Sequence, residues 1–283
     1  MDKKYIIGVS GGPDSMCLLD KYKKHIELVC HVNYKKRPTV NRDETIVRDY
    51  CKSNHLKVKV LNVTKAIYHK YQKLYGNNFQ NIARLIRYDF FLKNGTNVLI
   101  AHNKDDFIET ALMQLKRKTK SLFLGIHKKS LYKTLHIFRP LLNKRKNELQ
   151  KYCDQHNIIY GIDESNLINI YQRNKLRKEI NKWSIKKFNK TFDKISSFNK
   201  KNQKKQTLIN QQFNKWEGLK FSTKFNLNEY LIYQYLLFIN ESNINSQKIN
   251  SLIRFIKSNK GNIKFRLSSN HFIVKKNHKI RFI

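Results

Sequence analysis

The stretch Tyr5–Leu19, YIIGVSGGPDSMCLL, decides the fold of this chain. The apolar run Tyr5–Val9 is short, rich in β-branched residues and followed by a glycine pair, so it predicts a buried strand. Met16–Leu19 is apolar as well and predicts the start of a helix. Between them, Gly11 and Gly12 allow a sharp turn and let an anion approach bare N–H groups. The helix N-terminus adds unpaired donors, so the stretch predicts a phosphate site that needs no lysine.

The turn itself, SGGPDS, does not have the spacing of a Walker A loop, which requires G-x-x-x-x-G-K-[ST]. It resembles the SGGxDS signature of the PP-loop ATP pyrophosphatases, enzymes that split ATP into AMP and pyrophosphate. The alternative is an ordinary strand–turn–helix in which Asp14 or Ser15 caps the helix. The resemblance implies that the whole turn binds ATP: Ser10, Gly11, Gly12, Pro13, Asp14 and Ser15.

Further strands are predicted at 26–33, 57–63 and 97–101, and helical spacing separates them. This alternation indicates an α/β fold with a doubly wound, mostly parallel sheet, whose ligands bind beyond the carboxyl ends of the strands. Polar residues follow three of the strands, so we expect one site. It would contain the turn 10–15, His31, Asn33 and the run 102–109, which begins with His102. The alternative is that the two histidines are satisfied polar residues at strand ends.

The helix that follows the fourth strand carries acidic residues in a very basic chain. Its spacing predicts a buried apolar stripe of Ile108, Leu112 and Leu115. Asp106 and Glu109 then share another face near the start of the helix. The alternative is that Asp105 or Asp106 simply caps this helix.

Two pairs of arginines are predicted to share helix faces. Arg84 and Arg87 lie on one side of the amphipathic segment 79–91, away from its apolar stripe. Arg173 and Arg177 are four residues apart, so a helix would present both on one side. Guanidinium groups suit bidentate contacts with phosphate. The alternative for the first pair is a role in surface ion pairs.

The composition points to a polyanionic partner. The chain has 58 Lys and Arg against 20 Asp and Glu, a net charge of +38, which exceeds what solubility requires and favours nucleic acid. The abundance of Asn, Ile and Lys is also what an AT-rich coding sequence produces, so part of this charge is expected to be solvated surface. The lysines of 182–224 could contact nucleic acid or could simply form a solvated surface.

We expect three parts along the chain: a catalytic domain at 1–181, a basic helical linker (one helix or a pair) at 182–216, and a small α+β domain at 217–283. In the last part, two amphipathic helices precede a short antiparallel meander. The four cysteines are isolated, which argues against a zinc site or disulfides and fits a reducing cytoplasm. No signal peptide or apolar run of membrane-spanning length is found, so we expect a cytoplasmic protein that does not bind membranes.

Several blocks in order resemble the bacterial tRNA(Ile)-lysidine synthetases, a family of PP-loop ATP pyrophosphatases. The resemblance covers most of 4–180, and the small terminal domain is similar to the family's first C-terminal domain. Longer members have a second such domain, so we expect a short form. The blocks are VSGGPDS, HVNYKKR with NRDE, ARLIRYDFF, AHNKDDFIET, FRPLL and DESN with YQRNKLR.

The resemblance implies that the wobble cytidine of tRNA(Ile) with a CAU anticodon is converted to lysidine, using ATP, Mg²⁺ and free lysine. Transfer of AMP to the cytosine C2 oxygen makes it a good leaving group, and the lysine ε-amine then displaces AMP. It also implies roles for individual residues. Asp14 and Asp106 would bind the metal, Asp106 and Glu109 would receive the lysine amine, and His31, Asn33 and His102 would line the nucleotide site. Arg84 would act in catalysis, and Arg87, Arg173, Asn174 and Arg177 would contact the substrate or the tRNA.

Two other functions stay open from the sequence. Another PP-loop tRNA-modifying enzyme, such as a thiolase, would usually carry C-x-x-C pairs, and a nucleotide synthetase would add a glutaminase domain. A non-catalytic basic RNA-binding protein would not need the acidic pair Asp106 and Glu109 beside a phosphate loop. The chain could be a monomer or a homodimer, and the sequence does not decide which.

Overall fold

The computed structural model describes residues 4–35, 40–117, 121–162, 172–239, 241, 244–259, 261, 263–267 and 271–283. The chain forms two compact units. The N-terminal unit comprises 1–73, 77–109 and 126–182, and the C-terminal unit comprises 74–76, 110–125 and 183–283. The long helix after residue 184 belongs to the C-terminal unit, whereas the division into three parts at 181 and 216 stays a prediction.

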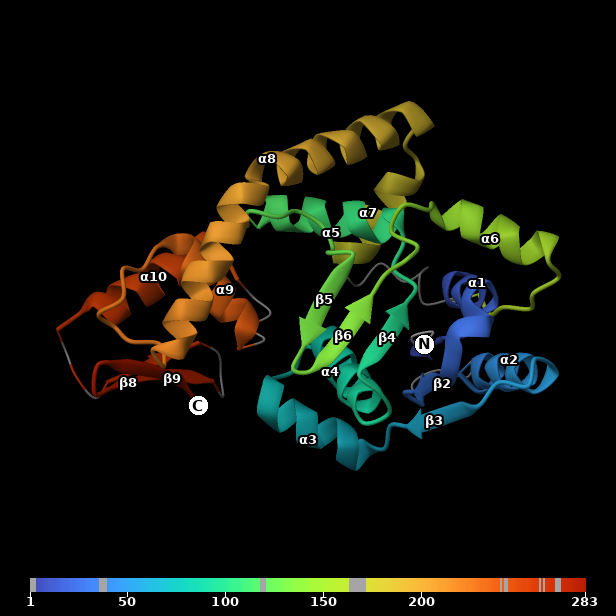
Figure 1. The fold of residues 1–283 in the computed structure, drawn as a ribbon, viewed down its shortest axis with the longest axis horizontal. Helices are drawn as coiled ribbons and strands as arrows, with labels where there is room; N and C mark the ends of the chain where they lie inside the picture. The colour runs from blue at the N-terminus through green and yellow to red at the C-terminus, as the bar shows by residue number, and fades with distance from the viewer. Residues whose placement is uncertain are drawn as a thin grey trace. The chain divides into compact units, whose positions relative to one another are not determined.

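The N-terminal unit is built on a six-stranded sheet with the order β3-β2-β1-β4-β6-β5 (Figure 1). Only the edge strand β5 runs antiparallel to its neighbour. This confirms the predicted doubly wound, mostly parallel sheet. The carboxyl ends of β1, β2 and β4 share one edge, where the polar runs begin. The strands are β1 (Tyr5–Gly8), β2 (Ile26–Asn33), β3 (Val58–Asn62), β4 (Asn97–Ile100), β5 (Lys129–Tyr132) and β6 (Leu135–Phe138).

Helices cover both faces of this sheet. The larger core joins side chains of β1, β2 and β4 to one set of helices: α1 (Pro13–Tyr22), α2 (Val40–Ser53) and α6 (Lys146–Gln155). A second core lies against the other helices: α3 (Lys65–Tyr75) and α4 (Phe79–Leu92). Two further helices carry charged residues that the sequence assigned to the site: α5 (Lys104–Lys116) and α7 (Gln172–Asn181).

One sequence prediction needs correction. Leu115 is 52 % exposed, although the apolar spacing of its helix placed it in the buried stripe with Ile108. In the small domain Asn245 caps the second helix by accepting from the Lys248 amide at 2.8 Å. Helical spacing therefore finds an element but not always its end or its buried face.

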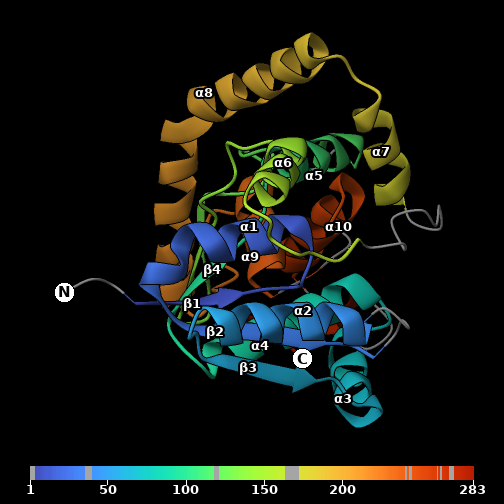
Figure 2. The same ribbon diagram turned by 90° about the vertical axis from the view of Figure 1, so that its right-hand side faces the viewer.

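The C-terminal unit consists of helices and a small antiparallel sheet. The basic segment forms one helix rather than a pair, α8 (Ile185–Gly218), which bends along its length in Figures 1 and 2. The Trp216 side chain is fully buried and donates to the Ser222 carbonyl at 2.9 Å, and the rings of Phe221 and Tyr235 pack around it. The predicted meander is confirmed. The other elements are α9 (Glu229–Phe238), α10 (Ser246–Lys257), β7 (Ile263–Arg266), β8 (Phe272–Lys276) and β9 (Lys279–Phe282).

Two further observations concern the chain as a whole. All four cysteines are buried free thiols. Within the described residues, no helix combines the length and the apolar character that crossing a membrane requires.

Candidate active site

The turn after β1 is held in a conformation that only glycine adopts without strain. Gly11 has φ +87°, and a Cβ there would lie 2.9 Å from the Asp43 carbonyl oxygen. The Gly11 carbonyl accepts from the Gly161 amide at 2.8 Å. A Cβ on Gly161 would in turn meet the Asp43 carboxylate. The start of α2 and the segment after α6 thus fix the turn from outside.

The serines close the turn from inside. The Ser15 hydroxyl donates to the Gly12 carbonyl at 2.9 Å and accepts from the Ser10 amide at 3.1 Å. Gly12 is the N-cap of α1, Pro13 is the first helical residue, and no side chain caps the helix among the described residues. The alternative of an ordinary cap by Asp14 or Ser15 is therefore wrong. The helix start keeps backbone donors for an anion.

Asp14 is a half-buried residue whose carboxylate is only half satisfied. Its Oδ2 accepts from Asn103 Nδ2 at 3.1 Å, whereas its Oδ1 is buried and has no hydrogen-bond partner among the described residues. Burial, and then the nearby carboxylate of Asp106, raise the pKa of Asp14 to about 7, although Lys146 and Arg177 oppose this shift. A buried acceptor without a donor indicates a ligand site rather than a structural contact.

Two acidic residues of α5 share one arginine. Arg177 Nε donates to Glu109 Oε1 at 2.7 Å, and Arg177 Nη2 lies 3.7 Å from Asp106 Oδ1. Burial disfavours the charge of Arg177, but the hydrogen bond to Glu109 and the charges of the nearby carboxylates together outweigh burial and raise the pKa of the guanidinium. The sequence predicted all three residues for the site, and the structure brings them together. The site thus gathers two carboxylates and one guanidinium at the start of α5.

Asn103 caps α5, and Asp106 is its reciprocal partner in the first turn, so neither Asp105 nor Asp106 is itself the N-cap that the alternative interpretation expected. The Asn103 amide donates to Asp106 Oδ2 at 3.1 Å, and the Asp106 amide donates to Asn103 Oδ1 at 2.9 Å. Asp105 has a different role, because its carboxylate accepts from the guanidinium of Arg145 and from the Lys146 amide at 2.9 Å. These contacts attach α6 to α5 and bring the cation of Lys146 near the PP-loop.

The polar residues at the end of β2 have structural partners. His31 Nδ1 donates to the Val9 carbonyl at 2.9 Å, so Nε2 carries the lone pair, and it is buried without a partner among the described residues. Burial lowers the pKa of His31, which keeps the ring neutral. Asn33 donates to Glu44 at 2.8 Å and accepts from the Lys35 amide at 2.9 Å. Their proposed contact with ATP stays a prediction.

The arginines of α4 have partners other than the acidic cluster. Arg84 is exposed and donates to Asn81 Oδ1 at 3.1 Å. Arg87 interacts with Tyr34, which raises the pKa of the guanidinium above its usual value. Arg173 and Asn174 lie in α7, but their side chains are outside the described residues, as is the segment DESN. A role of these four residues toward substrate stays a prediction.

Magnesium fits the donor set of this site. Mg²⁺ is bound in proteins by one or two carboxylates and otherwise keeps water or takes phosphate oxygens. Asp14 supplies a buried oxygen without a donor, and Asp106 lies close enough to raise the pKa of Asp14. No group of three or more His, Cys, Asp or Glu suited to a metal occurs in the described part of the chain. That Asp14 and Asp106 hold the ion stays a prediction, which their oxygen donors fit.

The sequence did not single out four residues that shape this site: Asn103, which bonds Asp14, and Lys146, Asp43 and Gly161. Asn103 lies between predicted site residues, so its place at a strand end was a usable signal. Lys146 and Gly161 are far from the turn in the chain. No local pattern connects them with it.

Three comparisons with known proteins agree with this geometry. A model of the PP-loop domain matches residues 1–183. The tRNA(Ile)-lysidine synthase of Malacoplasma penetrans is 44 % identical over 100 % of this chain and 99 % of its own length. That of Ureaplasma parvum is 41 % identical over 90 % of this chain and 79 % of its own.

Among solved structures, the U34-tRNA thiolase NcsA of Methanococcus maripaludis superposes with a TM-score of 0.55. It covers 71 % of this chain and 73 % of its own at 16 % identity, so it supports the fold alone. The two synthases match at moderate identity over 90 % or more of this chain, and the PP-loop model covers residues 1–183. The chain belongs to the tRNA(Ile)-lysidine synthase family, and its PP-loop domain occupies residues 1–183.

Proposed function

We propose that this chain uses ATP to join free lysine to the wobble cytidine of tRNA(Ile) with a CAU anticodon. The observation that carries the proposal is the half-satisfied carboxylate of Asp14, which lies between a glycine turn and the acidic residues of α5. A binding protein without catalysis gains nothing from burying a carboxylate oxygen that has no partner, because this burial costs stability. A site that cleaves ATP would use this oxygen to bind the metal ion on the phosphates.

The first step is adenylation of the base. The cytosine C2 oxygen attacks the α-phosphorus of ATP, and the bond to the β-phosphate oxygen breaks, which releases pyrophosphate. The N–H donors of the Gly11 and Gly12 turn, with the Ser10 hydroxyl, would bind the leaving pyrophosphate. The Ser15 hydroxyl, which donates to the Gly12 carbonyl, would hold the turn in shape. Magnesium, held by Asp14 and Asp106, would neutralise the charge on the phosphates.

The second step is attack by the lysine ε-amine on C2, which expels AMP. The amine is nucleophilic only when it is neutral, so the site must bind the ammonium group and then accept a proton. Asp106 and Glu109 would bind the ammonium group and accept the proton. Arg177 already holds both carboxylates, so the substrate cation would share these oxygens with the arginine. The target base lies in a single-stranded loop and can turn into the pocket without opening a duplex.

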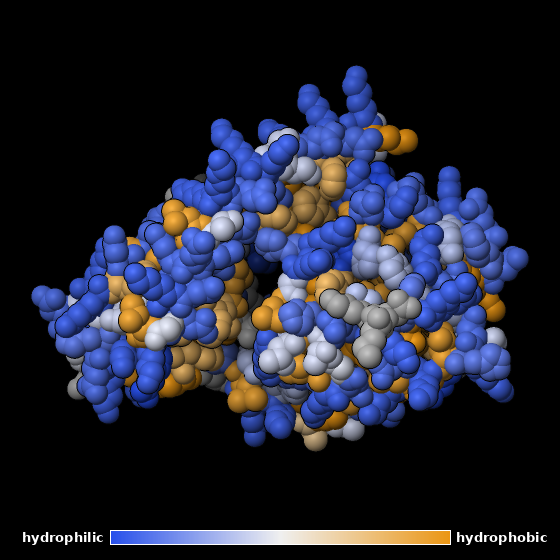
Figure 3. All heavy atoms as spheres, viewed as in Figure 1, coloured by the Kyte–Doolittle hydropathy of each residue, from blue (hydrophilic) through white to orange (hydrophobic). Residues whose placement is uncertain are grey.

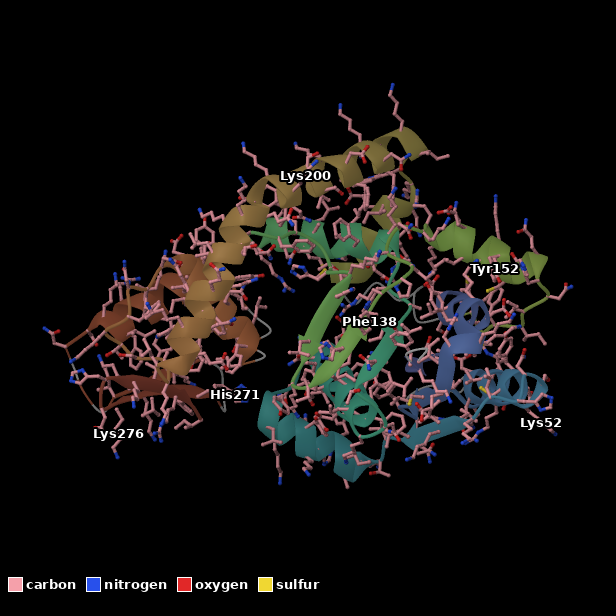
Figure 4. All side chains as sticks on the ribbon, in the orientation of Figure 1. Lys52, Phe138, Tyr152, Lys200, His271 and Lys276 are labelled. Carbon is pink, nitrogen blue, oxygen red and sulfur yellow. The ribbon has the colours of Figure 1, made fainter. Side chains whose placement is uncertain are left out.

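The α8 helix is the proposed tRNA contact of the C-terminal unit. Its projecting side chains are mostly hydrophilic in Figure 3, and Lys200 is labelled on it in Figure 4. Two adjacent pairs of lysines on α8 are exposed, and the ammonium group of Lys205 lies over the Tyr230 ring; the pairs are Lys200 with Lys201 and Lys204 with Lys205. Such a basic face suits the phosphate backbone of RNA. The same pattern would result from a merely solvated surface, so the contact needs its own test.

The deciding experiment supplies labelled lysine, ATP and tRNA(Ile) with a CAU anticodon to the purified protein. Label is expected in the tRNA only when ATP is present, with one AMP and one pyrophosphate released for each lysine joined. A tRNA with the same anticodon that normally carries methionine serves as the control. Transfer of sulfur or no transfer at all would contradict the proposal, and RNA binding without ATP cleavage would favour the non-catalytic alternative.

A further inference from the structure

His31 is a buried histidine with one ring nitrogen that no described residue satisfies. It lies near the end of β2, which pairs with β1 in the sheet (Figure 2). The residue is 2 % exposed. Its Nδ1–H donates to the Val9 carbonyl at 2.9 Å, whereas Nε2 is buried and has no hydrogen-bond partner among the described residues. A bare acceptor at this depth costs stability, and a fold tolerates it where a ligand supplies the donor.

The bond to Val9 decides what kind of group Nε2 can bind. A backbone carbonyl only accepts, so the ring proton lies on Nδ1 and the lone pair lies on Nε2. Burial lowers the pKa of His31, which keeps the ring neutral. Phosphate oxygens are themselves acceptors, so they cannot satisfy a second acceptor. His31 Nε2 therefore requires an O–H or N–H donor from the ligand.

The charges around His31 also favour a neutral part of the ligand. Those that act on the ring belong to the start of α2, namely the carboxylates of Glu44 and Asp43 and the guanidinium of Arg48. Arg48 Nε donates to Glu44 Oε1 at 2.8 Å, and Arg42 pairs with Asp43 at 2.8 Å. These cations are thus compensated by carboxylates. The start of α1 differs, because its backbone donors suit an anion.

ATP carries hydrogen-bond donors on the hydroxyls of its ribose and on the exocyclic amine of its adenine. Val9, the partner of His31, directly precedes Ser10, the first residue of the turn that would hold the phosphates. The ribose is joined to the phosphates, whereas the amine lies at the far end of the nucleotide. We propose that His31 Nε2 accepts a hydrogen bond from a ribose hydroxyl of ATP, so that His31 selects ribonucleotides over deoxyribonucleotides. The identity of the ligand as ATP rests on the proposed function.

Two substitutions separate the acceptor of His31 from its contact with Val9. His31→Asn can keep an amide N–H for the Val9 carbonyl, but it has no atom at the position of Nε2. His31→Gln can place its amide oxygen near that position and so retain an acceptor. The matched control is His25→Asn, the same change at an exposed histidine that immediately precedes β2.

Titration calorimetry with ATP, 2′-deoxy-ATP and 3′-deoxy-ATP measures the selection. The wild type should bind ATP about ten- to hundredfold more tightly than the analogue that lacks the bonded hydroxyl, because that analogue leaves Nε2 unpaired. His31→Asn should bind ATP and this analogue alike, His31→Gln should keep part of the preference, and His25→Asn should match the wild type. Tripolyphosphate has no ribose, so its affinity should stay within about twofold in all four proteins.

An unchanged preference for ATP in His31→Asn would overturn the inference. Equal losses of ATP and tripolyphosphate would overturn it as well, since His31 would then act only by shaping the turn through Val9. Purine riboside triphosphate lacks the adenine amine and tests the other donor. A preference for ATP over this analogue that disappears in His31→Asn would assign Nε2 to the amine instead of the ribose.

The ring supplies a readout that does not depend on affinity. In protein labelled with ¹⁵N-histidine, the His31 signals are assigned by their loss in His31→Asn. We expect a protonated Nδ1 and an unprotonated Nε2, whose ¹⁵N resonance moves upfield when ATP is added. A protonated Nε2 would overturn the inference. ATP binding with the expected selection but without lysine transfer would contradict the proposed function alone, whereas a wild type that does not bind ATP would contradict both.

Discussion

Lys275 in the C-terminal unit and Asp14 in the N-terminal unit are both largely buried charged groups, but their surroundings differ. Lys275 Nζ donates to the carbonyl oxygens of Phe255, Ile256 and Ser258 and to the Ser258 hydroxyl, at the end of α10. Its charge therefore meets oxygen atoms on several sides. One oxygen of Asp14 accepts from Asn103, and the other has no partner among the described residues.

The difference separates structural from functional charges. Lys275 donates to carbonyls at the end of α10, so its burial stabilises the small domain. Asp14 receives too few donors, and its raised pKa of about 7 records the cost. A fold tolerates such a group where a ligand completes it. The following predictions test this contrast in order of expected effect.

The largest effect is expected for Asp14→Asn on catalysis. The amide keeps the size of the side chain and can still accept from Asn103, but it removes the charge that would hold Mg²⁺. Release of AMP and pyrophosphate should fall at least about a hundredfold. Binding of tRNA, measured by filter retention, should stay within about twofold. Normal adenylation by this variant would make Asp14 a structural residue like Lys275.

The same variant should be more stable than the wild type above neutral pH. The pKa of Asp14 is about 7 in the fold, against 3.8 for an unperturbed aspartate, so between these pH values the folded state holds a proton that the unfolded state has lost. Wild-type stability therefore falls relative to Asp14→Asn as the pH rises from about 4 to about 7, and the difference then stays constant. It should reach at most on the order of 4 kcal/mol. Urea unfolding at pH 4 to 8 without Mg²⁺ measures this, and a difference independent of pH would contradict it.

Lys275→Met should destabilise the C-terminal unit. Its methylene groups are replaced, but the carbonyls at the end of α10 lose their shared donor. The expected loss is about 1–3 kcal/mol in the free energy of unfolding. Lys276→Met is the matched control, since Lys276 is the exposed neighbour on the same strand, and it should change stability by less than about 0.5 kcal/mol. Equal effects of the two variants would remove the contrast with Asp14.

The smallest effect is expected from exposed charges on α8. Lys200→Glu with Lys204→Glu should leave the folding temperature nearly unchanged, because surface charges contribute little to stability. If α8 contacts tRNA, the slope of log affinity against log salt should fall by about 1.5 to 2. Lys21→Glu, on the first helix of the other unit, provides a comparison of equal type. An unchanged salt slope would assign the lysines of α8 to solvated surface.

The sequence by itself determined the local elements. The change from a β-branched run to a glycine turn to an apolar helix is a short-range pattern, and so is the alternation of strands and helices that makes the sheet parallel. It also determined the family, because six blocks occur in order. The apolar periodicity predicted burial less reliably at the ends of helices. Leu115 is exposed because the last turns of α5 are less buried than the first.

Only the tertiary structure decided which charged residues meet. Arg145 bonds Asp105 across 40 residues, and Arg177 bonds Glu109 across 68. Arg139 reaches His102 across 37 residues. Hydrogen bonds of this kind depend on distance and direction in space, about which spacing along the chain carries no information. The satisfaction of a buried charge is therefore a property of the fold, and it is this property that distinguishes Asp14 from Lys275.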